Sequence, residues 1–251
     1  VQSLGLVHVF SEEIDSVTGN VEWVRIGEEP LHFRTSTKTS LFHVVLTKDA
    51  TRLVVGIDNG MDNSNVESTK NSLMVHEYDE ESMGSWGNGV EFAVNGTLHA
   101  FSVVTPPGMN CSFVGCMHDE RASVFLIDDT GLLDPNPLKQ IDIQYNGDRP
   151  SSFDVAFSQS GKHVAFAYTE DSIEMNFNVL LLEMDSDTEE EWIEFGNVYN
   201  LVFADSLQGV SVALNHDASV LGVGIPDTID PTTFEPQTGS LFVFERNNGP
   251  E

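Results

Sequence analysis

Short runs of β-branched and aromatic residues, separated by polar turn residues, recur along the whole chain. Four stretches of fifteen residues align without a gap, and they are Phe42–Gly56, Phe101–Gly115, Phe153–Ala167 and Val210–Gly224. In each of them two hydrophobic runs flank five residues that favour a turn. Each stretch therefore predicts a β-hairpin.

The four predicted hairpins agree at fixed positions. The third residue is valine in each, namely Val44, Val103, Val155 and Val212. The last residue is always small, namely Gly56, Gly115, Ala167 and Gly224. The hairpins start 59, 52 and 57 residues apart. This agreement indicates an internal structural repeat.

Further strands are predicted after the hairpins. The third strands are Ser72–Tyr78, Ser123–Ile127, Asn178–Leu182 and Ser240–Arg246. The fourth strands are Val90–Val94, Gln140–Tyr145, Trp192–Gly196 and, in a leading blade, Trp23–Gly27. No stretch of a dozen residues has helical periodicity. Repeated units of four strands are typical of β-propeller blades, with a β-sandwich of equal strand count as the alternative.

We therefore expect one all-β domain over residues 1–251, a partial β-propeller of four-stranded antiparallel blades with a repeat of about 52–59 residues. Gly5–Phe10 matches Gly239–Phe244, so the chain is expected to begin and end within incomplete blades. The blades are predicted at residues 1–30 (partial), 42–95, 101–147, 153–200 and 210–251 (partial). The partial blades either join into a small closed propeller or belong to a larger ring, which we favour.

The last repeat resembles a known propeller repeat. Residues 209–226 read GVSVALNHDASVLGVGIP and residues 239–245 read GSLFVFE. These are similar to the FG-GAP (integrin α-type) and WD40-like repeats of large extracellular algal and bacterial proteins. Trp192–Gly196 and Trp23–Gly27 resemble the W-x-x-L-G motif that closes such blades. The resemblance implies a propeller used for recognition or as a scaffold, and it implies no reaction.

FG-GAP blades often hold Ca²⁺ in a D-x-D-x-D-G loop, so the resemblance directs attention to acidic loops. The nearest match is residues 58–65, where Asp58, Asp62 and Asn63 are candidate ligands in a different order. The alternative is a solvated acidic loop. Ca²⁺ is the one cofactor that we consider, and none is required.

The charge limits the choice of partners. Eleven Lys and Arg residues against forty Asp and Glu residues leave a net charge of −29. This balance argues against nucleic acid or an anionic membrane as the main partner, because both require clustered cations. The apolar runs are too short for a membrane-spanning helix. A protein or glycan ligand is expected, and the sequence leaves the oligomeric state open.

One ring of residues could carry catalysis. The second hairpin residue is polar in every repeat, as His43, Ser102, Asp154 and Ser211. Equivalent positions on the first strands of propeller blades line the central channel, and Ser, His and Asp are the residues of nucleophilic catalysis. The alternative, which we favour, is that these side chains face channel water or hydrogen-bond a neighbouring blade.

The aromatic residues are better explained by packing. Phe42, Phe101 and Phe153 share one repeat position, and Trp23 and Trp192 share another, so we expect both groups in the core between blades. Trp86 and Phe234 have no repeat equivalent and are the better candidates for ligand contact.

The cysteines and the glycosylation motifs bear on location. If Cys111–Cys116 is an extended strand, its two cysteines lie about 16 Å apart, too far for a disulfide, so two separate thiols are expected. Asn95 and Asn110 each begin an N-x-[ST] glycosylation motif. An extracellular or secretory location is expected, with a cytoplasmic scaffold left open. The start at Val1 suggests a processed or excised segment.

The sequence thus favours a non-catalytic binding or scaffold propeller. It would recognise a protein, a glycan or a cation through blade-face loops such as Asn59–Lys70 and Thr228–Thr238. The alternative is a propeller-fold hydrolase or lyase that acts on a polysaccharide or an ester. That alternative predicts carboxylates, or the residues of the ring, converging in a channel pocket.

Overall fold

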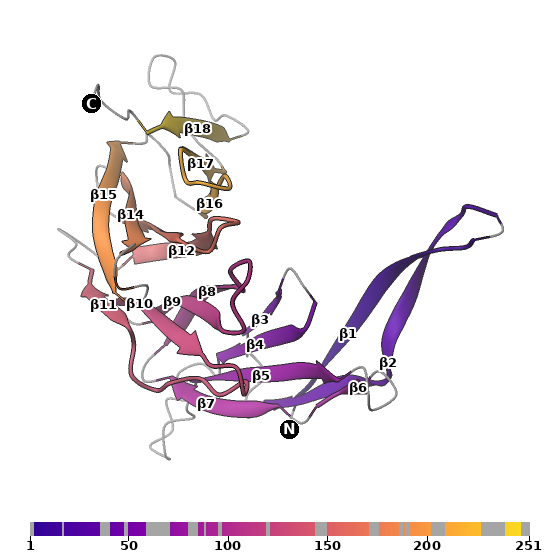
Figure 1. Ribbon diagram of the computed structural model, residues 1–251. Helices are drawn as coiled ribbons and strands as arrows, with labels where there is room; N and C mark the ends of the chain where they lie inside the picture. The colour runs from indigo at the N-terminus through magenta and orange to yellow at the C-terminus, as the bar shows by residue number, and fades with distance from the viewer. Residues whose placement is uncertain are drawn as a thin grey trace. The chain divides into compact units, whose positions relative to one another are not determined.

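Figure 1 shows a computed structural model of the chain. The structure describes residues 3–16, 18–35, 41–47, 50–58, 71–79, 85–87, 89–94, 97–118, 121–143, 150–170, 176–185, 188, 191–201, 209–226 and 239–246. Every element in these ranges is a β-strand. This described part of the chain has no helix long and apolar enough to cross a membrane. The chain divides into two compact units, Val1–Asn95 and Gly96–Glu251, which are described separately.

The first unit contains two sheets. The strands β1 (Ser3–Ile14) and β2 (Val21–Thr35) form a two-stranded antiparallel sheet. The second sheet contains β3 (Leu41–Leu46), β4 (Arg52–Asp58), β5 (Asn71–Asp79), β6 (Ser85–Trp86) and β7 (Val90–Val94). In this β3–β7 sheet both β6 and β7 pair with β5. Val9 and Phe33 of the hairpin pack against Leu53, Val55 and Ile57 of β4.

The second unit contains three antiparallel sheets, and in each the strands pair in chain order. The β8–β11 sheet consists of β8 (Leu98–Val104), β9 (Ser112–His118), β10 (Arg121–Ile127) and β11 (Lys139–Asp142). The β12–β15 sheet consists of β12 (Pro150–Phe157), β13 (His163–Glu170), β14 (Asn176–Met184) and β15 (Trp192–Leu201). The β16–β18 sheet consists of β16 (Ser211–Leu214), β17 (Val220–Ile225) and β18 (Ser240–Glu245).

These three sheets stack face to face. Phe113 and Val124 of the first pack against Phe166, Leu182 and Trp192 of the second. A separate buried cluster joins the second sheet to the third. The first strands β8, β12 and β16 lie beside one another. Sheets that stack in sequence with adjacent first strands are the blades of a propeller. The predicted fold class, all-β with propeller-type four-stranded blades, is confirmed.

The small last residue of the repeat has a packing role. A Cβ atom on Gly115 would lie 3.1 Å from Val155 Cγ1 and 3.1 Å from Val164 Cγ2 of the next sheet. Ala167, at the same repeat position, is fully buried against the β16–β18 sheet. The repeat therefore needs a small side chain here so that the next sheet can approach.

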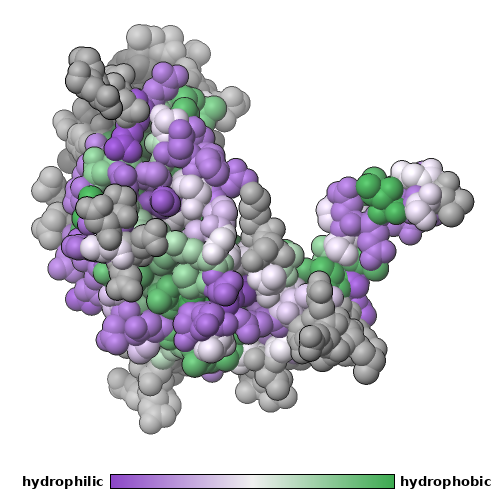
Figure 2. Space-filling view, in the orientation of Figure 1, coloured by the Kyte–Doolittle hydropathy of each residue, from purple (hydrophilic) through white to green (hydrophobic). Residues whose placement is uncertain are grey.

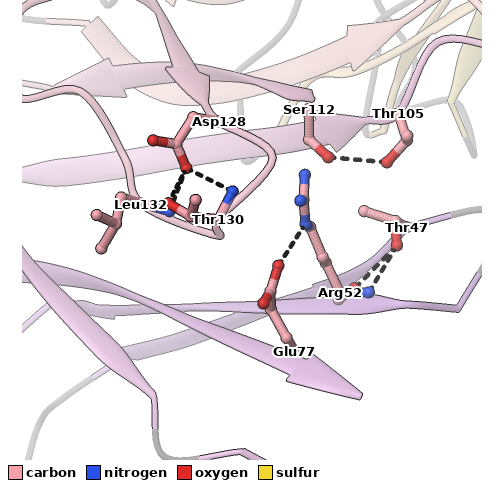
Figure 3. Close-up of polar contacts among 8 residues, drawn as sticks. All are labelled: Thr47, Arg52, Glu77, Thr105, Ser112, Asp128, Thr130 and Leu132. Carbon is pink, nitrogen blue, oxygen red and sulfur yellow. Dashed lines mark hydrogen bonds and ion pairs between the residues drawn. The ribbon is translucent and has the colours of Figure 1, made fainter. Parts of the chain in front are cut away.

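The hairpin turns are closed by side chains that recur with the repeat. The first turn residue accepts a hydrogen bond from the backbone N–H five residues later: Thr47 Oγ1 from Arg52 (3.0 Å), Ser158 Oγ from His163 (3.2 Å) and Asn215 Oδ1 from Val220 (2.9 Å). Figure 3 shows the first of these, together with the ion pair between Arg52 Nε and Glu77 Oε1 at 3.1 Å. Short polar side chains favour such turns because their oxygen atoms can accept a hydrogen bond from a backbone N–H group of the turn.

The predicted strands agree with the structure. All four hairpins form, and three of the predicted third strands fall within β5, β10 and β14, while the last matches β18 except that β18 ends at Glu245. The predicted fourth strands overlap β2, β7, β11 and β15. Trp86, a predicted candidate for ligand contact, lies in the short strand β6, where its ring packs against Tyr78 and against the buried cluster of Val9, Phe33, Leu53, Val55 and Ile57. The single-domain organisation and its blade boundaries stay a prediction.

Candidate functional site

The four predicted ring residues occupy first strands in both units. His43 lies on β3 of the first unit, whereas Ser102, Asp154 and Ser211 lie on the adjacent strands β8, β12 and β16 of the second. Asp154 is bound by backbone N–H groups: Oδ1 accepts from Val155 at 2.9 Å, and Oδ2 accepts from Val212 at 2.7 Å. This carboxylate therefore joins β12 to β16 of the next sheet, as expected of a ring side chain that hydrogen-bonds a neighbouring blade. Catalysis by the ring stays a prediction.

A buried His–Ser pair went unrecognised in the sequence. His118 Nε2 lies 3.0 Å from Ser123 Oγ, and both residues are buried. In nucleophilic catalysis, a serine hydroxyl is activated by an imidazole within hydrogen-bond distance. Here the pair links the end of β9 to β10 inside the core, where a substrate has no access. We assign it a structural role.

The predicted calcium site falls mostly outside the described residues. Asp58 ends β4, while Asp62 and Asn63 lie in the 59–70 segment, which the structure does not describe. Among the described residues, no group of three His, Cys, Asp or Glu side chains could hold a metal ion. The loop 228–238, Phe234 and Asn95 also lie outside the described residues, whereas Asn110 is exposed at the end of the β8–β9 turn.

The two cysteines are separate thiols, as predicted. Cys116 is fully buried, and burial raises the pKa of its thiol to about 12. It therefore stays protonated at neutral pH and is a poor nucleophile.

An apolar groove lies in the first unit. Its volume is about 470 Å³, and it is lined by Val7, His8, Val9, Phe10, Trp23, Val44, Leu46 and Leu53. These residues come from β1, β2, β3 and β4, so we call it the β1–β3 groove. Figure 2 shows hydrophobic residues at the surface of the β1–β2 hairpin. Leu6, Ile14 and Val21 add exposed apolar side chains along the same hairpin.

Trp23 is the main correction to the predicted core. Trp192, at the same repeat position, is fully buried, and Phe113 of the preceding sheet packs edge-on against it with the ring centroids 5.5 Å apart. Trp23 is instead 67% exposed. Within the described part of the first unit, no sheet packs on Trp23 as the β8–β11 sheet packs on Trp192, and Trp23 is among the residues that line the groove. The prediction of a core position for Trp23 is wrong.

The groove also borders one edge of β1. Among the described residues, β5, β10 and β14 each have a strand on both sides, whereas β1, their repeat equivalent, pairs only with β2.

Comparisons with known proteins do not assign a function. No known protein family matches the chain, and no curated protein matches it by sequence. The chain is similar to the β-propeller domain of Nup133 from Vanderwaltozyma polyspora, with 8% identity and a TM-score of 0.44 over 98% of this chain and 84% of that one.

Two further solved structures are similar at the same level. A prolyl endopeptidase has 13% identity and a TM-score of 0.43 over 97% of this chain and 34% of its own. A proposed 6-phosphogluconolactonase from Bacteroides uniformis has 14% identity and a TM-score of 0.35 over 91% and 76%. Similarities as distant as these carry no information about function.

Proposed function

We propose that the chain is a non-catalytic binding and scaffold module that recognises another protein in the β1–β3 groove. The observation that carries the proposal is the exposed Trp23 in an apolar groove beside the edge of β1 that has no partner strand among the described residues. Exposed apolar patches of this kind mark protein interaction sites, and exposed tryptophan is enriched at their energetic centres. The apolar lining favours a protein over a glycan or a cation.

The groove would bind its partner by strand addition. The partner's backbone would pair with the edge of β1 opposite β2, and its alternate side chains would cover Val44 and Leu46 of β3. The binding energy would come from hydrophobic burial, at about 25 cal/mol per Å² of apolar surface, and the paired backbone would set the register.

Two finer points belong to the same proposal. The resemblance of the last repeat to FG-GAP or WD40-like repeats supports recognition outside the cell, and the exposed Asn110 is a compatible glycosylation site. The hydrolase or lyase alternative has no specific observation in its favour, since the described groove is lined by apolar side chains and a single histidine.

A displayed peptide library tests the proposed function. Random peptides would be selected on the full chain and then screened against Val44→Lys, which places a charge in the groove. We expect peptides with alternating hydrophobic residues that bind the wild type and lose at least about tenfold in affinity for the variant. Leu132→Lys, a change at an exposed leucine of the second unit, is the matched control and should bind normally. Peptides that bind all three proteins equally would contradict the proposal.

A further inference from the structure

The imidazole of His76 is enclosed between β5 and the chain that follows β6. His76 lies on β5 and is 5% exposed. Its Nδ1 lies 3.0 Å from the carbonyl oxygen of Gly87, which can only accept, so Nδ1 carries a hydrogen and donates it. The N–H of Gly87 donates in turn to the carbonyl of Glu77 at 2.8 Å. A Cβ atom on Gly89 would lie 2.5 Å from the imidazole. The ring therefore fastens the end of β6 to β5.

The same ring supports the β1–β2 hairpin. Phe33 of β2 stands perpendicular to it, with the ring centroids 5.5 Å apart. Phe33 belongs to the buried cluster that contains Val9 and Leu53, and Trp86 of β6 packs against that cluster. β6 also contacts β2 (Figure 1). Val9 and Leu53, the register partner of His76 on β4, both line the β1–β3 groove. His76 therefore helps to hold the residues that form the groove.

The second ring nitrogen has nothing to bond. Nε2 of His76 is buried and has no hydrogen-bond partner among the described residues. In the neutral ring this nitrogen is an acceptor without a donor. In the protonated ring it would be a charged N–H without an acceptor, which is much more costly to bury. The closed arrangement therefore accepts the neutral imidazole and disfavours the charged one.

No described neighbour compensates a charge on the ring. The described residues around it are apolar or uncharged, and they are Phe33 from β2, Leu53 from β4, and Gly87 and Gly89 after β6. Of the ionisable residues beside them, Arg52 and Glu77 pair with each other at 3.1 Å, and the Tyr78 ring packs on Trp86. Burial accordingly lowers the pKa of His76, although the hydrogen bond to the backbone partly opposes the shift.

We propose that His76 is a pH-sensitive latch that keeps the β1–β3 groove formed at neutral pH and releases it in acid. The neutral ring holds β6 and β2 on the β3–β7 sheet. The protonated ring leaves its site to find an acceptor for Nε2–H, which frees the Gly87 carbonyl and withdraws the support of Phe33. The effect on binding rests on the proposed function, whereas the latch itself belongs to β2, β5 and β6.

The two protonation equilibria set the size of the effect. In the released state the ring titrates near the ordinary histidine pKa of 6.5, whereas the closed site resists protonation. The latch is therefore fully closed above that pH and opens progressively below it. Between pH 7.5 and pH 5.5 the ratio of released to closed molecules should rise severalfold, up to about tenfold.

Amide hydrogen exchange of Gly87 in the full chain tests the latch without a ligand. Corrected for the intrinsic effect of pH, its protection should fall severalfold, up to about tenfold, from pH 7.5 to pH 5.5. His76→Asn keeps an N–H donor near the Nδ1 position and does not titrate, so its Gly87 protection should be equal at both pH values. His163→Gln, a change at the buried histidine of the second unit, is the matched control and should respond like the wild type.

A second variant mimics the released state. Gly89→Ala places a methyl group against the imidazole and should lower Gly87 protection at pH 7.5 to about the wild-type level at pH 5.5. Circular dichroism and urea midpoints at pH 7.5 show whether each variant folds. Wild-type protection that does not change with pH would overturn the latch, and so would an equal change in His76→Asn or full protection in Gly89→Ala.

Peptide affinity links the latch to the groove. Selected peptides without Asp, Glu or His should bind the wild type severalfold more weakly at pH 5.5 than at pH 7.5, and His76→Asn equally at both. His8 lines the groove itself, so His8→Gln is needed as a control and should retain the wild-type ratio of affinities. A latch that opens while peptide affinity stays constant would overturn the regulation of the groove. If no peptide is selected, the proposed function fails, and the exchange of Gly87 still decides the latch.

Discussion

At the scale of single residues, the fourth turn position of the hairpins shows how one backbone conformation recurs with different side chains. Ala50, Gly161 and Ala218 occupy this position with positive φ values of 56°, 73° and 55°. Glycine adopts this conformation freely, whereas alanine pays about 1 kcal/mol for it. Two of the four hairpins therefore carry local strain at an alanine, which glycine at the same position would avoid.

A glycine at Ala218 should stabilise the second unit. We expect Ala218→Gly to raise the free energy of unfolding by about 0.5–1 kcal/mol, because the left-handed strain disappears. Gly161→Ala should lower it by about 2 kcal/mol, since a Cβ atom there would also lie 2.6 Å from Pro106 Cγ. Urea unfolding measures both. Equal stabilities for Ala218→Gly and the wild type would contradict this account of the turn.

Two buried histidines should make folding sensitive to acid. Burial lowers the pKa of His76 and of His163, although the carboxylate of Glu183 partly opposes the shift at His163. As the pH falls below the ordinary histidine value of about 6.5, the unfolded chain takes up protons that the folded chain does not. The stability that the two neutral histidines contribute is therefore fully present above that pH and is lost progressively below it.

The expected result is a lower urea midpoint at pH 5.5 than at pH 7.5. His163→Gln removes one of the two groups and should reduce the difference between the two midpoints. A variant whose midpoint falls with pH as steeply as that of the wild type would exclude His163 as a cause.

At the scale of elements, the repeat explains what the sequence could and could not predict. The hairpins and outer strands follow from runs of valine and phenylalanine around turn residues, so the local sequence pattern predicted their positions. Trp23 was wrongly placed in the core because its repeat position indicates which face it occupies, whereas burial depends on whether another sheet covers that face. The groove depends on neighbouring sheets, which no local pattern reveals, whereas a hydrogen bond from Asp154 to a neighbouring blade was among the roles that the repeat favoured.

The Asp154 contact holds two sheets together and can be tested by substitution. Asp154→Ala removes the acceptor of the N–H groups of Val155 and Val212, and we expect it to lower the free energy of unfolding by about 1.5–3 kcal/mol. Asp154→Asn keeps one acceptor oxygen and should cost less. Ser211→Ala, on the neighbouring strand, is the control. If Asp154→Ala unfolds at the same urea concentration as the control, the carboxylate does not fasten β16 to β12.

At the scale of the whole molecule, charge and exposed apolar surface act in opposite directions. The net charge of −29 destabilises the folded state through self-repulsion, while the exposed apolar side chains of the β1–β3 groove favour contact with a partner. Salt or divalent cations screen the repulsion and would favour the folded state.

Salt should therefore stabilise the folded chain. We expect the melting temperature, measured at about 5 μM protein, to rise by several degrees between about 10 and 500 mM NaCl because the self-repulsion is screened. Adding Ca²⁺ or EGTA at fixed ionic strength separates specific metal binding from screening, and a Ca²⁺-specific rise would support a site in the acidic loops. A melting temperature indifferent to salt would contradict the role given to charge.

Hydrogen–deuterium exchange with a selected peptide tests the central claim most directly, since it locates the partner on the chain. With the peptide bound at low protein concentration, amides in Leu6–Phe10 of β1 should exchange at least about tenfold more slowly, while those of β14 stay unchanged. The Val44→Lys chain should show no such protection. Protection confined to other segments, with β1 exchanging as in the free protein, would show that the β1–β3 groove is not the binding site.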